Sequence, residues 1–149
     1  MSDPALTLRQ AGPETIDRVE AMVAANDLPT RDIRERSGSF FLASADDEAI
    51  GVGGVETHGE YGLLRSVVVN EPYRGQGYGQ ALCAALEARA RADGVETLYL
   101  LTTTAAGFFR RCGYEECSRD AVPEPIRATT QFAELCPLTA SCLRKRLDQ

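Results

Sequence analysis

The sequence predicts one α/β domain in which helices flank a single mixed sheet that is mainly antiparallel. Two apolar runs, residues 49–57 and 61–69, are separated only by His58-Gly59-Glu60, which predicts an antiparallel hairpin. The second run leads through a glycine-rich stretch and a helical pattern into the apolar run 95–103, which predicts a strand–helix–strand unit containing a parallel strand pair. With 149 residues and 44% hydrophobic composition, the chain is expected to form a single domain over residues 1–149.

The elements before the hairpin follow from periodicity. Alternating or apolar residues predict strands over 5–11 and 39–45. Residues 12–26 place apolar side chains at helical spacing on one face, and residues 30–38 are expected to form a second, shorter helix.

The elements after the glycine-rich stretch alternate between helix and strand. A helix is expected to end near Gly94, and a strand is expected over 95–103. The remaining predictions are a helix over 105–113, a strand over 114–118, a helix bracketed by Pro125 and Pro137, and a last strand over 140–147.

Charge and hydropathy exclude several functions. The net charge of −6 argues against a nucleic-acid partner, because phosphates reward clustered Lys and Arg. No apolar stretch is long enough to span a bilayer, and the N-terminus lacks the pattern of a signal peptide. We therefore expect a cytoplasmic protein with no membrane partner.

The cysteines predict reduced thiols rather than a disulfide framework. Five cysteines are present, which is an odd number in a chain without a secretory signal. No pair has C-x-x-C spacing and His58 is the only histidine, so no metal site is expected.

The stretch from Arg74 to Gly79 has the features of an anion site. It holds Gly75, Gly77 and Gly79 between an expected strand and an expected helix. The start of a helix offers unpaired backbone N–H groups, and the absence of side chains lets phosphate oxygens approach them. Arg74 adds a charge-assisted donor. The spacing fits neither a nucleotide P-loop nor a dinucleotide fingerprint.

The order Arg74-x-x-Gly77-x-Gly79 resembles the pyrophosphate-binding motif of the GCN5-related N-acetyltransferase (GNAT) superfamily. The surrounding "LLRSVVVNEPYRGQGYGQAL" is similar to the central strand, loop and helix of that superfamily. This resemblance implies a GNAT fold and acetyl-CoA as cosubstrate, with the pantetheine arm on the backbone of the central strand. The implied cofactor-binding residues are Val67, Val68, Val69, Arg74, Gly75, Gln76, Gly77, Tyr78, Gly79 and Gln80.

The stretch "AAGFFRRCGYEE" resembles the later helix-and-strand motif of the same superfamily, with one departure. Many GNAT enzymes have a tyrosine at the position of Phe109, where it protonates the leaving thiolate. Phenylalanine cannot donate that proton, so Tyr114 and Cys112 are the alternative acids, unless the thiolate leaves without one. For Tyr114, packing in the core is the competing interpretation.

A narrower resemblance covers most of the chain. The stretches "LYLLTTTAAGFF" and "PEPIRATTQFAELCPLTASCLRK" are similar to the N-acetyltransferases associated with arsenic-resistance operons. Related enzymes acetylate the amino group of glutamate-like organoarsenicals, which implies a small-molecule amine as acceptor. Dimers are frequent in the superfamily, so a homodimer is one expectation.

Glu56 is the candidate catalytic base. If the strand has no bulge, Ile50, Val52, Gly54 and Glu56 share one face, and a carboxylate among apolar residues is partly desolvated and so a better base. The alternative is that the strand ends at Val55 and Glu56 faces solvent.

Three further residues are candidates for binding the acceptor. Arg65 is in phase with Val67 and Val69 and is expected to meet an anion, either a substrate carboxylate or an internal partner. Arg127 either binds an acidic acceptor or lies on a solvated helix face, and Thr103 ends a strand near the expected site.

The sequence therefore predicts an N-acetyltransferase that acts on a small amine such as an amino acid or an arsenical analogue of one. The alternatives left open are an ordinary amino-acid N-acetyltransferase, a non-catalytic acyl-CoA sensor and a protein-modifying acetyltransferase.

Overall fold

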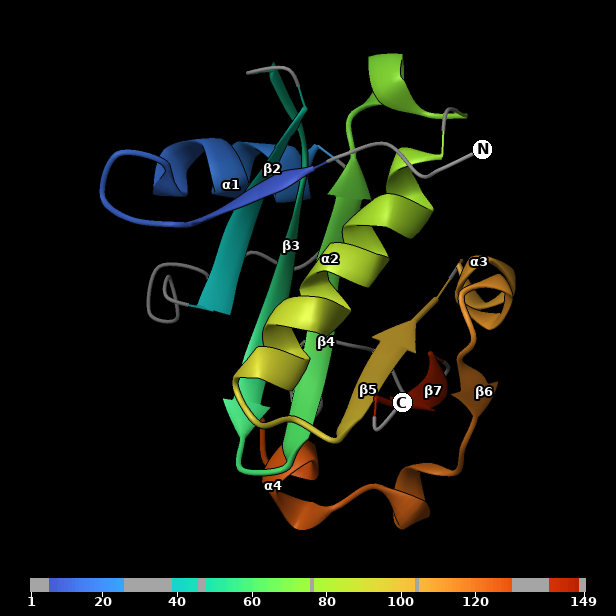
Figure 1. Cartoon of the computed structure of the whole chain (residues 1–149). Helices are drawn as coiled ribbons and strands as arrows, with labels where there is room; N and C mark the ends of the chain where they lie inside the picture. Colours follow the sequence, from blue (N-terminus) through green and yellow to red (C-terminus); the bar gives the residue numbers. More distant parts are fainter. Residues whose placement is uncertain are drawn as a thin grey trace.

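A computed structural model describes residues 6–25, 39–45, 48–75, 77–103, 105–129 and 140–147 (Figure 1). The helix predicted over 30–38 lies outside the described residues, as do Gln76 and most of the helix predicted before Pro137.

Among the described residues, seven strands and four α-helices follow the predicted order. The strands are β1 Thr7–Gln10, β2 Phe40–Ala45, β3 Glu48–His58, β4 Tyr61–Val69, β5 Thr97–Thr102, β6 Glu115–Glu116 and β7 Ser141–Arg146. The helices are α1 Ile16–Ala24, α2 Tyr78–Ala92, α3 Ala106–Arg111 and α4 Glu124–Arg127, with short 3-10 turns at Glu71–Tyr73 and Arg119–Ala121. No helix in this described part is long and apolar enough to cross a membrane.

The strands form one mixed sheet in the order β1-β2-β3-β4-β5-β7-β6. Every neighbouring pair is antiparallel except β4 and β5, which run parallel. The predicted hairpin is β3–β4, and the predicted strand–helix–strand unit is β4–α2–β5. The expectation of a mainly antiparallel sheet with one parallel pair is confirmed.

Helices cover both faces of the sheet (Figure 1). On one face, α2 packs through Leu82 and Leu86 against apolar side chains of β2, β3, β4 and β5. The opposite face carries α1, which packs on β2 and β3, and α4, which packs through Ile126 on β4, β5 and β7. Alternate residues of each strand therefore enter different cores, as the period of two requires.

Two bulges correct the predicted phase of the central strands. In β3, Ala43 pairs with Gly51 and Ser44 with Ala49, which leaves Ile50 outside the register and on the α2 face. The prediction that Ile50 shares a face with Glu56 is therefore wrong. A bulge inserts one residue into one strand of a pair, and the alternation of faces changes at that point.

The second bulge lies in β4. Val52 pairs with Val68 and Gly54 with Arg65, so Gly53 faces both Ser66 and Val67. Ser66 has a φ of 56°, a left-handed conformation that is uncommon for a residue with a side chain. The prediction that Arg65 is in phase with Val67 and Val69 is wrong, because this bulge reverses the faces between them.

Only the first part of the predicted late helix lies within the described residues. The described helix α4 ends at Arg127, and Ala128 and Thr129 form a turn and a bend. Arg127 is thus the last residue of α4. The proline at position 123 precedes the first helical residue and fits there because its missing N–H would lie at an unpaired helix start.

Candidate functional site

The parallel strands β4 and β5 diverge over half their length. They pair only from Tyr61–Leu63 to Thr97–Tyr99, whereas β5 is paired with β7 on its other side from Thr97 to Thr102. Figure 1 shows the two arrows separating toward their carboxyl ends. The backbone of β4 from Leu64 to Val69 therefore has no strand partner on its β5 side within the described sheet. Such an edge can accept an extended ligand as an additional strand-like partner.

The carboxyl end of β4 leads directly to the start of α2. Gly77 is the N-cap of α2, with a φ of 85° and no side-chain cap. Gly75 also has a positive φ, 79°, and a Cβ built on it would meet nothing within 4 Å. The first N–H groups of α2 are therefore left for an anion, in an open place that side chains do not fill. The residues present fit the pyrophosphate group that the sequence predicted here.

The other residues predicted to hold the cofactor surround this opening. Val67 and Val69 are half-buried on the α2 side, whereas Val68 is buried on the α1 side. The Nε atom of Arg74 donates a hydrogen bond to the carbonyl of Val69, 2.9 Å away. Tyr78 and Gln80 lie in the first turn of α2, and Gln76 lies outside the described residues.

Gly79 sets how closely α2 approaches α3. A Cβ at this position would lie 3.1 Å from two ring atoms of Phe108, which is closer than side chains ordinarily pack. The glycine therefore serves helix packing as well as ligand access. The sequence indicated only the second of these roles.

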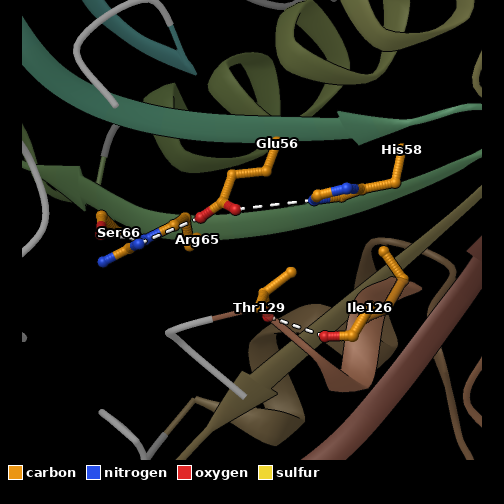
Figure 2. A network of polar contacts seen from close by, with 6 residues as sticks. All are labelled: Glu56, His58, Arg65, Ser66, Ile126 and Thr129. Atoms are coloured by element: carbon orange, nitrogen blue, oxygen red, sulfur yellow. Dashed lines mark hydrogen bonds and ion pairs between the residues drawn. The ribbon is translucent and has the colours of Figure 1, made fainter. Parts of the chain in front are cut away.

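Glu56 and Arg65 form a buried ion pair on the face covered by α4 (Figure 2). The Nη1 atom of Arg65 donates to Oε2 of Glu56 over 3.1 Å, and the two residues are 3% and 2% exposed. Strand β3 continues to His58, so the alternative that Glu56 faces solvent is wrong. Of the two partners proposed for Arg65, the internal one is present.

Two neighbours of this pair were not recognised as site residues from the sequence. The Nε2 atom of His58 lies 3.7 Å from Oε1 of Glu56 and makes no hydrogen bond within the described chain. The hydroxyl of Ser66, at the bulge, accepts a hydrogen bond from Nε of Arg65 over 3.4 Å. The period of two along β3 was a usable signal for His58, whereas no sequence feature marks the bulge at Ser66.

Tyr114 lies in the core on the opposite face from Glu56. Its hydroxyl donates to Glu87 over 3.0 Å, and its ring packs edge-on against Phe109. Burial, together with the Glu87 carboxylate, raises the pKa of Tyr114 above its ordinary value. The expectation of core packing is confirmed. The role as leaving-group acid stays a prediction. The raised pKa does not favour this role, because the phenol releases its proton less readily.

The remaining acceptor candidates lie outside this buried pair. Thr103 is exposed just beyond β5, where Thr102 accepts a hydrogen bond from the backbone N–H of Ala105. Arg127 is exposed at the end of α4. Their roles stay predictions.

Comparison with protein families gives one match that covers most of the chain. The model of the acetyltransferase (GNAT) family matches residues 9–114, from β1 to the start of β6. An uncharacterised N-acetyltransferase of Chlorobaculum tepidum is 31% identical over 112 residues, which are 74% of this chain and 69% of that protein.

Named relatives match a shorter part. The amino-acid acetyltransferase of Pseudomonas syringae pv. tomato is 45% identical over 73 residues, or 49% of this chain. The chain spans only 14% to 17% of the amino-acid acetyltransferases it matches in Ectopseudomonas mendocina and P. syringae.

Solved structures support the fold. N-acetylglutamate synthase from Neisseria gonorrhoeae, complexed with coenzyme A and N-acetyl-glutamate, superposes on 99% of this chain with a TM-score of 0.84 at 22% identity; the match covers 36% of that chain. Rv2747 from Mycobacterium tuberculosis, in complex with CoA, gives a TM-score of 0.77 over 94% of this chain and 98% of that one, at 20% identity.

Proposed function

Because the chain belongs to the acetyltransferase (GNAT) family, we propose that it transfers the acetyl group of acetyl-CoA to the amino group of a small, acidic amine. The acceptor class is an amino acid of the glutamate type or a glutamate-like organoarsenical. The observation that carries this proposal is the position of the buried Glu56–Arg65 pair beside the bulge where β4 leaves β5.

Four observations support an amino-acid-like acceptor. Relatives that are 45% identical over part of the chain are named amino-acid acetyltransferases, and a structure with the same fold holds N-acetyl-glutamate. The guanidinium of Arg65 is a cation on the α4 face and could meet an acceptor carboxylate there. The resemblance to arsenic-resistance enzymes supports the organoarsenical as one member of this class.

Acetyl-CoA supplies an activated thioester, and the chain supplies its placement and a base. The backbone of Val67–Val69 and the start of α2 are suited to hold the extended arm and the pyrophosphate. Glu56 takes a proton from the acceptor ammonium, so that a neutral amine attacks the thioester carbonyl. The C–N bond forms as the C–S bond breaks, and the proton that the nitrogen then releases passes through water to the leaving thiolate, which gives the amide and the free thiol. Holding both substrates in one orientation supplies much of the rate enhancement.

His58 gives the proton on Glu56 a route outward. Glu56 is almost sealed from solvent, whereas the side chain of His58 is 28% exposed and faces it at 3.7 Å. An imidazole ring has two nitrogens, so it can accept a proton at one and release a proton from the other. In this proposal His58 carries the proton from Glu56 to water after each transfer, so it acts through Glu56 and does not touch the acceptor.

The second candidate function is an acyl-CoA sensor without catalysis. The observation that favours it is Phe109, which is buried in the core and offers no proton to a leaving thiolate. A sensor needs the β4–α2 cofactor site but not a base at Glu56.

The test is acetylation measured by mass spectrometry with a panel of acceptors. The panel contains glutamate, other amino acids, a glutamate-like arsenical, polyamines and a lysine peptide. We expect transfer to the glutamate-like compounds, with Glu56→Gln lowering turnover at least a hundredfold, a magnitude typical of a lost general base. Acetyl-CoA affinity, measured by calorimetry, should change less than threefold in this variant.

Each other result has a distinct meaning. Transfer only to the lysine peptide would replace the small-molecule proposal with protein acetylation. If the native chain binds acetyl-CoA but transfers the acetyl group to no acceptor of the panel, and Glu56→Gln binds acetyl-CoA equally well, the result would favour the sensor. Absence of acetyl-CoA binding would overturn the cofactor site itself.

A further inference from the structure

A cavity lies away from the Glu56–Arg65 pair, on the face of the sheet covered by α2. It has a volume of about 210 Å³. Its lining comes from α2, the end of α3 and β7, and the residues are Gln80, Cys83, Ala84, Glu87, Arg111, Cys112 and Lys145. The proposed acetyl transfer uses none of the two thiols, the two cations or the carboxylate gathered there.

The two thiols of this cavity interact with each other. Cys83, 1% exposed, lies in α2, and Cys112, which is half-buried, ends α3. Both residues line this one cavity, so the two thiols face the same space between α2 and α3. The neighbouring Cys83 thiol, helped by Lys145 and Arg111, lowers the pKa of Cys112 to about 7, whereas the pKa of Cys83 is raised. Cys112 is thus the sulfur that is both accessible and ionised near neutral pH.

Fixed groups hold Cys112 in this position. The ammonium of Lys145 donates to the carbonyl of Cys112 over 2.8 Å and to Glu87 over 2.9 Å. Glu87 is fixed in turn by the Tyr114 hydroxyl. Arg111 is exposed at the rim, where its guanidinium suits a carboxylate on an incoming molecule.

We propose that Cys112 is a thiol-modification site for small disulfides that carry carboxylates, with Cys83 as the resolving thiol. The Cys112 thiolate attacks one sulfur of the small disulfide, whose S–S bond breaks as a Cys112 mixed disulfide forms and one small thiol leaves. Cys83 then loses its proton to water and attacks the Cys112 sulfur, and the second small thiol leaves. The two cysteines are oxidised to one disulfide by two electrons, and the small disulfide is reduced to two thiols.

The other described thiol pair provides an internal comparison. The sulfur atoms of Cys117 and Cys142 lie 3.2 Å apart between the chain after β6 and β7. Burial raises the pKa of Cys142 to about 12. Neither of these cysteines lines the α2–α3 cavity. Sulfur proximity alone would therefore favour Cys117 and Cys142, whereas thiolate character and the cavity favour Cys112.

The experiment treats fully reduced protein with glutathione disulfide at several pH values and maps every cysteine by mass spectrometry. In the native chain we expect a Cys83–Cys112 disulfide. In Cys83→Ser and Cys83→Ala the glutathione adduct should remain on Cys112, because the resolving thiol is gone. The midpoint of the pH–rate profile should stay near 7 in Cys83→Ser, which keeps a donor, and move toward the ordinary thiol value of 9.0 in Cys83→Ala.

Three results would overturn the proposal. Reaction first at Cys117 or Cys142 would show that sulfur proximity decides reactivity. Equal midpoints of the pH–rate profile in Cys83→Ser and Cys83→Ala would show that the Cys83 thiol does not stabilise the Cys112 thiolate. An unmodified Cys112 in every variant would remove the site. The Cys83→Ser variant, which preserves size and hydrogen bonding, keeps the test valid if Cys83→Ala does not fold.

Discussion

Glu56 and Arg65, nine positions apart in the chain, form one buried unit: Nη1 of Arg65 lies 3.1 Å from Oε2 of Glu56. The hairpin β3–β4 brings them together, since Gly54 is the register partner of Arg65 and Glu56 lies two residues farther along β3. The base and the cation proposed for the acceptor site are therefore not independent. A change in either one alters the charge that the other faces.

Removing only the cation should destabilise the protein strongly. We expect Arg65→Met to lower the free energy of unfolding by about 3 kcal/mol, because it leaves a buried carboxylate without its guanidinium. The double variant with Glu56→Gln should lose clearly less than the sum of the two single changes. Urea unfolding measures this, and simple additivity would contradict the coupling.

An exposed ion pair serves as the control. Arg89 and Asp93 are one helical turn apart, 3.2 Å from each other and 43% and 46% exposed. Asp93→Asn should cost no more than about 0.5 kcal/mol, because solvent screens such pairs.

Gly79→Ala should weaken acetyl-CoA binding about tenfold. Its new methyl group would lie 3.1 Å from the Phe108 ring, so the start of α2 must shift by a few tenths of an ångström. The control is Gly107→Ala in α3, whose methyl group would meet Arg111 at an ordinary 3.7 Å. Calorimetric titration of both variants with acetyl-CoA compares them, and equal affinities would remove the packing role of Gly79.

Tyr114→Phe tests whether the phenol is structural or catalytic. Loss of the hydroxyl donor to Glu87 should reduce stability by about 1.5 kcal/mol, while kcat should change less than twofold. A large fall in kcat with unchanged stability would instead assign Tyr114 as the leaving-group acid.

Tyr114→Phe also serves to test a pH dependence of the native chain's stability. Because the folded state raises the pKa of Tyr114 above its ordinary value of 10.0, the stability that the protonated phenol contributes is present below pH 10 and is lost as the pH rises further. The difference in the free energy of unfolding between the native chain and Tyr114→Phe should therefore become smaller above pH 10. A difference that grows with pH would contradict the sign.

His58→Gln should lower kcat about tenfold with little change in KM for either substrate. The reason is that the proton on Glu56 loses the imidazole through which it reaches water. Added imidazole should restore part of the rate in His58→Gln but not in Glu56→Gln. If added imidazole restores no activity in His58→Gln, His58 does not carry the proton from Glu56 and its role is structural.

Local patterns predicted the elements whose signals are contained in a few residues. The hairpin followed from a three-residue connection between two apolar runs, and the start of α2 followed from Gly75, Gly77 and Gly79. Glu56 could be placed because β3 alternates regularly from Val52 onward. The end of α4 at Arg127 was not predicted, because prolines at positions 125 and 137 bracket a segment without marking a helix end at that residue.

The sequence by itself determined the order of the elements, the mixed sheet and the uncapped glycine-rich start of α2. Only the tertiary structure decided that Ser66 bulges, that Arg65 therefore faces Glu56 rather than the side of Val67, and that Cys83 and Cys112 line one cavity between α2 and α3. The physical reason is that helical and strand periods are local properties of the chain. Bulges, ion pairs and thiol contacts depend on the register between strands and on the packing of helices, which residues distant in the sequence set together.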